Sequence, residues 1–144
     1  MTEPISNAGH APLSERFTQA RVAQSQAVLE DYAEMIDDLA QEMGEARITD
    51  IAARMGVTHP TATKAVARLK REGLAMSRPY RGVFLTETGV ALAARVRMRH
   101  RVVVDLLVAV GVPQDTAEID AEGLEHHVSD VTLRAFEAFL AGKA

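Results

Sequence analysis

Cysteine and tryptophan are absent from this 144-residue chain, and aromatic residues make up only 4% of it. Without cysteine the chain forms no disulfides and offers no thiolate ligands to a metal, which fits the reducing cytoplasm. The scarcity of aromatics argues against a platform for stacking single-stranded bases. No apolar run approaches the ~18 residues of a membrane span, and the opening MTEPISNAGHAPLSE lacks the pattern of a signal peptide. The composition predicts a cytoplasmic protein without a membrane partner.

The net charge of −4 is unevenly distributed along the chain. Residues 1–45 hold nine acidic and two basic side chains, whereas residues 46–85 hold eight basic and two acidic ones. Residues 86–100 have a surplus of two positive charges, and residues 101–144 have a surplus of five negative charges. A basic middle in an acidic protein indicates one surface for an anion such as nucleic acid, flanked by segments with another task.

The basic middle has the pattern of a winged helix-turn-helix. The run ITDIAARM, with Thr49 as its expected cap, predicts a short helix that ends at Gly56. Thr58 then begins a second helix, which tolerates Pro60 in its first turn and ends near Gly73. Two strands over about 74–77 and 83–86 are expected to form a wing, whose tip would carry Arg78, Tyr80 and Arg81.

The flanks are predicted to be helical. Ser14 is a possible cap of a long helix that follows a flexible tail over 1–14 and runs to Met43, before Gly44. A further helix over about 88–110 begins basic and ends in the apolar run VVVDLLVAVGV. Pro113 opens a short helix, and Ser129 caps a last one over 130–141. The fold class is therefore mainly α, with a winged helix-turn-helix domain over 15–87 and an all-helical domain over 88–144.

Trihelical units of this kind also occur in proteins that do not touch DNA. Here, however, the second helix and the wing offer hydroxyl, imidazole and cationic groups suited to base edges and phosphates. The predicted DNA-binding residues are Thr58, His59, Thr61, Thr63, Lys64, Arg68, Arg78 and Arg81. The expected partner is double-stranded operator DNA.

The stretch DAEGLEHHVSD places Glu122, Glu125 and His126 at i, i+3 and i+4, so on a helix they share one face. Such a face is most often a solvated stripe, but it can also be an acid/base pair or half of a metal site. His127 lies about 100° from that face, which favours packing or an outer hydrogen bond over direct ligation.

Other residues add to the metal hypothesis. Asp31 and Glu34 form a second carboxylate pair at i, i+3, and His100 stands alone in an arginine-rich run. Four carboxylates and two imidazoles without sulfur suit Mn²⁺ or Fe²⁺ better than a structural zinc site. From the residues alone, each of these six side chains could also be an ordinary solvated surface residue.

Five sequence blocks occur in this order along the chain: LEDYAEMI, GEARITDIAARMGVTHPTATKAVARL, PYRGVFLTETG, RHRVVVDLLVAVGV and DAEGLEHHVS. Together they resemble the manganese-responsive transport regulators (MntR) of the diphtheria-toxin-repressor (DtxR) family, over about residues 29–139. The resemblance implies a winged helix-turn-helix joined to a helical dimerisation domain, with a binuclear metal site between them. It places the metal ligands at Asp31, Glu34, His100, Glu122, Glu125 and His126.

Two departures from the iron-sensing members of that family bear on the metal. Those members have Met and Cys at the positions that match Asp31 and Glu122, whereas this chain has carboxylates at both, as the manganese branch does. The chain ends at Ala144, which leaves no room for the additional C-terminal domain of the iron sensors. The segment before Leu29 is longer than in the shortest members of the family.

The resemblance implies a Mn²⁺-dependent repressor of manganese uptake genes that binds DNA as a homodimer, with Fe²⁺ as a second possible metal. The apolar run near 102–112 and the last helix are the expected dimer surface. One alternative is an iron-responsive or small-molecule-responsive winged-helix regulator whose acidic cluster is mere surface. Another is a carboxylate-bridged metal enzyme, but the chain has no HExxH, no paired ExxH motifs and no nucleophile elbow. We therefore expect no enzymatic activity.

Overall fold

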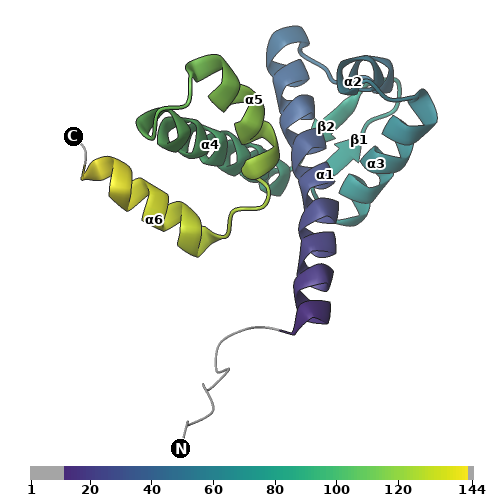
Figure 1. The fold of residues 1–144 in the computed structure, drawn as a ribbon. Coiled ribbons are helices and arrows are strands. Elements are labelled where there is room, and N and C mark those ends of the chain that lie inside the picture. Colours follow the sequence, from purple (N-terminus) through teal and green to yellow (C-terminus); the bar gives the residue numbers. More distant parts are fainter. Residues whose placement is uncertain (1–11, 143–144) are drawn as a thin grey trace, which may run out of the picture.

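The computed structural model describes residues 12–142. These form six α-helices and one β-hairpin, in the order α1 (Leu13–Met43), α2 (Ile48–Met55), α3 (His59–Arg71), β1 (Ala75–Ser77), β2 (Val83–Leu85), α4 (Glu87–Ala109), α5 (Gln114–Leu124) and α6 (Asp130–Ala141). In Figure 1 the long helix α1 stands between two units, with α2, α3 and the hairpin on one side and α4, α5 and α6 on the other.

Helix α1 serves both units. Its first half is largely exposed, while Leu29, Ile36 and Leu39 in its second half are buried. The expected cap at Ser14 is wrong, because the N-cap is Pro12, two residues earlier, and it makes no side-chain hydrogen bond to the helix. The Ser14 carbonyl instead accepts a hydrogen bond from Thr18. Most of the predicted tail, residues 1–11, lies outside the described part of the chain.

The helix-turn-helix folds as the sequence predicts, with one correction. Thr58 caps α3 by accepting a hydrogen bond from the Thr61 backbone N–H. Gly56 ends α2 in the left-handed conformation, with φ of 69°. Thr49 does not cap α2, since it lies in the first turn, and the N-cap position is held by Arg47 without a side-chain bond.

The wing is a short antiparallel hairpin in which Met76 pairs with Phe84. Ala46, which follows α1, adds a bridge to Val83 and so anchors the hairpin to the helices. The guanidinium groups of Arg78 and Arg81 lie 5.0 and 5.4 Å from the centre of the Phe84 ring. Both cations are thereby held at the wing by contacts of the cation–π type.

Helix α4 begins on the wing and ends in the second unit. Thr86 caps it by accepting a hydrogen bond from the Gly89 N–H. A Cβ at Gly89 would lie 2.1 Å from the Leu74 carbonyl oxygen, so only glycine lets the first turn of α4 approach the end of α3 and the start of β1 this closely. The position of α4 is thus fixed relative to α3 and the wing.

The core has two parts. The larger cluster joins α1, α2, α3, the hairpin and the start of α4, and includes Ile36, Ile51 and Leu69. The smaller one joins Val103 and Val104 of α4 to Ala117 and Ala121 of α5. Helix α6 buries no residue in the described chain, and Val131 and Phe139 are 70% and 47% exposed. Its apolar residues Leu133, Phe136 and Leu140 are only partly buried, and α6 packs against α4. None of the described helices combines the length and the apolar character needed to cross a membrane.

Candidate metal centre

The acidic residues singled out in the sequence lie where α1, α4 and the end of α5 meet. Asp31 and Glu34 come from α1, His100 from α4 and Glu122 from α5. Glu125 and His126 follow directly after α5, which ends at Leu124. The expectation that Glu122, Glu125 and His126 share one helical face is therefore only partly right. Glu125 keeps helical backbone angles and its N–H still bonds to the Ala121 carbonyl, but the chain turns away after it.

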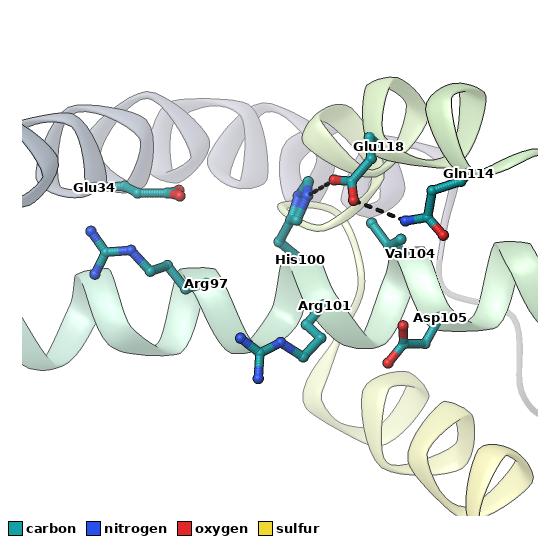
Figure 2. Close-up of a pocket in the computed structure, with 8 residues that line it drawn as sticks. All are labelled: Glu34, Arg97, His100, Arg101, Val104, Asp105, Gln114 and Glu118. Atoms are coloured by element: carbon teal, nitrogen blue, oxygen red, sulfur yellow. Dashed lines mark hydrogen bonds and ion pairs between the residues drawn. The ribbon is translucent and has the colours of Figure 1, made fainter.

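His100 has a carboxylate on each ring nitrogen. Its Nδ1 lies 2.6 Å from Glu125 Oε2 and 3.6 Å from Glu122 Oε1. Its Nε2 lies 2.7 Å from Glu118 Oε2, on the preceding turn of α5 (Figure 2). Burial alone would lower the pKa of His100, but the contacts with Glu118 and Glu125 outweigh it and raise the pKa.

His126 is held in the same way but more deeply. Its side chain is only 3% exposed, and its Nδ1 lies 2.7 Å from Glu30 Oε2. Its Nε2 lies 2.7 Å from Asp31 Oδ1 and 3.3 Å from Glu125 Oε1. Burial would lower the pKa of His126, but the contacts with Asp31 and Glu30 outweigh it and raise the pKa to about 10.

Glu125 connects the two imidazoles. It is fully buried, with Oε2 toward His100 and Oε1 toward His126. Burial, together with the charge of Glu122, raises the pKa of Glu125 to about 7. Within the described chain, Glu125 Oε1 and His126 Nε2 have no partner with hydrogen-bond geometry. Two buried polar atoms left in this way, side by side, fit a site built for a cation.

The donor atoms fall into two groups whose members all lie within 4.8 Å of one another. One group is Asp31, Glu125 and His126, and the other is His100, Glu122 and Glu125. Glu125 belongs to both, as a carboxylate between two ions would. Oxygen donors with imidazole nitrogens, and no sulfur, match the preference of Mn²⁺ and Fe²⁺. The residues present therefore fit a pair of divalent cations.

Glu34 lies near these groups without joining either one. It lines a cavity of about 290 Å³ between α1, α4 and α5, and Figure 2 shows its carboxylate across from Arg97. Burial and the nearby Glu122 raise the pKa of Glu34. His127 is exposed and lines a separate cavity beside the first half of α1. The residues lining the Glu34 cavity are Glu34, Arg97, His100, Arg101, Val104, Asp105, Gln114 and Glu118.

The predicted DNA-binding residues lie on α3 and the wing, where some are exposed and others bond to neighbouring residues. Thr58, His59, Thr61, Thr63 and Lys64 are exposed in the first two turns of α3 or just before it. Two predicted cations are engaged elsewhere. Arg68 donates to the Ser25 carbonyl of α1, and Arg81 bonds Glu45 at 2.8 Å. Arg78 is exposed at the wing.

The sequence patterns did not single out several polar residues of the candidate metal centre and of the surface formed by α3 and the wing. Glu30 and Glu118 contact the imidazoles, although neither belongs to an obvious ligand pattern. Their only sequence signals were adjacency to Asp31 and a spacing of four residues from Glu122. Between α3 and the wing, a cavity of about 320 Å³ is lined in part by Arg47, Lys70 and Ser77, which the helix pattern did not single out.

Two family models match the chain in tandem. Residues 26–83 match the N-terminal DNA-binding domain of iron-dependent repressors. Residues 86–142 match the metal-binding and dimerisation domain of the same repressors. The boundary between the matches falls at the wing–α4 junction, where Thr86 caps α4.

Relatives of known name agree with these matches. The chain is 49% identical over 125 residues to the transcriptional regulator MntR of Escherichia coli, covering 87% of this chain and 81% of that protein. It is 37% identical over 101 residues to the HTH-type transcriptional regulator MntR of Bacillus subtilis, covering 70% and 71%. Among solved structures, the manganese regulator SloR superposes with a TM-score of 0.69 at 32% identity. That superposition covers 78% of this chain and 53% of SloR, so the chain spans about half the length of that neighbour.

A DNA-binding domain joined to a metal-binding and dimerisation domain defines the class of metal-dependent transcriptional regulators. Within that class, the chain belongs to the iron-dependent (diphtheria-toxin) repressor family, in its MntR branch. It is therefore a DNA-binding regulator that self-associates, and not an enzyme.

Proposed function

We propose that this protein is a Mn²⁺-responsive repressor that binds double-stranded operator DNA as a homodimer in the cytoplasm and turns down manganese uptake genes when Mn²⁺ is plentiful. The observation that carries the proposal is the buried carboxylate of Glu125, placed between His100 and His126 with one oxygen lacking a hydrogen-bond partner. The likeness to the solved structure of the manganese regulator SloR supports the choice of metal.

Two subsites would share Glu125. Asp31 and His126 would complete one, and His100 and Glu122 the other. Glu34 would join them from the adjoining cavity by a change of side-chain rotamer. Bound Mn²⁺ supplies positive charge that converts the mutual repulsion of these carboxylates into attraction.

The residues themselves explain how metal could control DNA binding. Asp31 and Glu34 lie on α1, which also forms part of the core of the helix-turn-helix unit. His100, Glu122, Glu125 and His126 belong to the second unit. Ligands from three helices would tie α1 to α4 and α5 and so fix the orientation of α3 relative to the dimer. DNA half-sites about one helical turn apart, ~34 Å, demand a fixed orientation, so metal and DNA affinities would be linked.

The dimer surface would combine the exposed stripe of α6 with the end of α4. Val108 and Val110 are 40% and 64% exposed, and a second copy would cover such a surface. The dimer should persist without metal, since the metal-ligating groups lie elsewhere. Sedimentation of the metal-free chain at micromolar concentration should give a dimer, and a monomer would contradict this part of the proposal.

The decisive experiment titrates metal against DNA binding. Duplexes are first selected by the Mn²⁺-loaded protein from a randomised pool and then used as the probe. We expect binding that rises with free Mn²⁺ and is lost on chelation. Equal binding in the presence of chelator would instead favour a regulator that responds to a small molecule, and activation by Fe²⁺ alone would favour an iron sensor.

A further inference from the structure

Each imidazole of the candidate metal centre has one ring nitrogen toward the proposed ligands and the other toward a carboxylate outside that set. For His126 the outer carboxylate is Glu30, which contacts Nδ1. For His100 it is Glu118, which contacts Nε2. The inner nitrogens therefore differ: Nε2 of His126 faces Asp31 and Glu125, whereas Nδ1 of His100 faces Glu122 and Glu125.

Glu30 is held in place by more than its histidine. It is 4% exposed, and its carboxylate forms an ion pair with Arg99 of α4 at 3.2 Å. Arg99 is itself largely buried, with a side chain 17% exposed. Two partners from different segments thus fix the orientation of the Glu30 oxygen that contacts His126 Nδ1. A carboxylate restrained in this way can only accept a proton donor at Nδ1.

Glu118 is fixed at the surface of the centre by a different neighbour. Gln114 Nε2 donates to Glu118 Oε1 at 3.1 Å, which leaves Oε2 for His100 Nε2 at 2.7 Å. Figure 2 shows the three side chains in line, from Gln114 through Glu118 to His100. Although Glu118 is half-exposed, both of its oxygens have defined partners. It lies outside both donor groups of the described chain and contacts the ring nitrogen of His100 opposite the one that faces Glu122 and Glu125.

A neutral imidazole carries one N–H and one lone pair, and a carboxylate accepts only the N–H. An outer carboxylate therefore decides which ring nitrogen is left to bind a metal. Resting on the function proposed above, we propose that Glu30 and Glu118 are positioning residues that direct opposite ring nitrogens into the metal centre, Nε2 of His126 and Nδ1 of His100.

The first test reads the nitrogens directly on the unaltered chain. The protein is loaded with Cd²⁺ as a diamagnetic probe, and nitrogen NMR of the histidine rings identifies the metal-bound atom. We expect metal at Nδ1 of His100 with the proton on Nε2, and the reverse for His126. The same nitrogen bound in both rings, or the opposite assignment, would overturn the proposal. This readout needs no variant to fold.

The second test compares variants of Glu118 by direct Mn²⁺ binding without DNA, with free Mn²⁺ measured by electron paramagnetic resonance. Glu118→Ala should weaken Mn²⁺ binding by roughly 10-fold or more. Glu118→Gln should restore most of the affinity, because its amide oxygen still accepts the Nε2 proton. Asp120→Ala is the matched control, since it removes an exposed carboxylate from the same helix, whereas the carboxylates that contact His100 are those of Glu118, Glu122 and Glu125.

Glu30→Ala extends the comparison to the buried position and should weaken Mn²⁺ binding while preserving the helical circular-dichroism spectrum. Glu30→Gln should retain most of the affinity, because its amide oxygen can still accept the Nδ1 proton of His126. If the unaltered chain binds no Mn²⁺, the proposed function fails and this inference falls with it. If the unaltered chain binds Mn²⁺ but Glu118→Ala binds as well as Asp120→Ala does, the inference alone is wrong.

Discussion

Glu125 Oε2 lies 2.6 Å from His100 Nδ1, which joins the end of α5 to the middle of α4 through a fully buried carboxylate. The pKa of Glu125 is raised to about 7 and that of His126 to about 10. Near neutral pH in the metal-free protein, His126 therefore keeps its proton and Glu125 is about half protonated. A divalent cation binds the deprotonated forms, so metal and protons must compete for these side chains.

Mn²⁺ binding should release at least one proton per chain near pH 7. His126, with a pKa of about 10, supplies about one proton, and Glu125 supplies a further fraction because its pKa is about 7. Calorimetric titration in two buffers of different ionisation enthalpy measures the number released. The Mn²⁺ affinity should also rise with pH over this range. Binding without any proton release would contradict these pKa directions.

The metal-free protein should lose stability as the pH rises from about 5 to about 9. The pKa of Glu125 is raised above its ordinary 4.5, so the stability that its protonated form contributes is full below about 4.5 and is lost through about 7. The raised pKa of His126 contributes stability that is full below about 6.5 and is lost through about 10. Urea unfolding should show a decrease on the order of 5 kcal/mol, with the lower part of the slope missing in Glu125→Gln.

Metal choice should depend on coordination number more than on affinity. Mn²⁺ lies at the weak end of the general affinity order and favours about six oxygen or nitrogen donors, whereas Zn²⁺ favours about four. Zn²⁺ should therefore occupy the centre but leave α1 ligands such as Asp31 unbound and activate DNA binding poorly. Glu122→Cys should shift activation toward Fe²⁺ or softer metals, and His100→Ala should abolish the Mn²⁺ response. The measurement is DNA binding against each free metal. Full Mn²⁺ activation of His100→Ala would refute this account.

The wing should contact the DNA backbone through Arg81. In the free protein this side chain bonds Glu45 and lies over Phe84, so it must exchange one carboxylate for a phosphate. Arg81→Ala should weaken binding to all duplexes and reduce the salt dependence by about one unit of slope. Thr61 and Thr63 substitutions should change base preference instead. Arg21→Ala, on the exposed start of α1, is the control and should leave the slope unchanged.

Gly89→Ala should destabilise the fold by about 1 to 3 kcal/mol. A Cβ at Gly89 would collide with the Leu74 carbonyl oxygen, and α4 would have to move off the wing. Gly123→Ala is the matched control, because a Cβ there meets nothing within 4 Å in the described structure. Helix propensity predicts that this control is neutral or slightly stabilising. Thermal unfolding of the two variants distinguishes them, and equal melting temperatures would contradict the steric argument.

The sequence predicted helices and turns well where local chemistry decides them. Thr58 and Ser129 cap their helices as expected, since a hydroxyl beside free N–H groups is a local signal. The predicted caps at Ser14 and Thr49 were wrong, because Pro12 and Arg47 hold the N-cap positions instead. Several neighbouring residues could begin each helix, and helix boundaries are what local patterns predict least well.

The candidate centre was harder to predict because its contacts join distant segments. Glu30 reaches His126 across 96 positions of sequence, and no spacing rule relates the two. In the sequence, the spacing of Glu118 is that of a solvated helix face, and its contact with His100 becomes visible only when α5 packs against α4. The resemblance named six ligand positions, and of these the structure brings five into close groups while Glu34 stays in the adjoining cavity.

Because α1 is shared by both units, the proposed metal ligands are divided between two parts of the chain that a domain exchange would separate. A chimera of two relatives joined at Thr86 would inherit Asp31 and Glu34 from one parent and His100, Glu122, Glu125 and His126 from the other. Exchange of the DNA-reading half would then bring foreign metal ligands with it. A chimera could combine a new operator specificity with an unchanged metal specificity only if the relative that supplies the DNA-binding half has the same residues at the positions of Asp31 and Glu34.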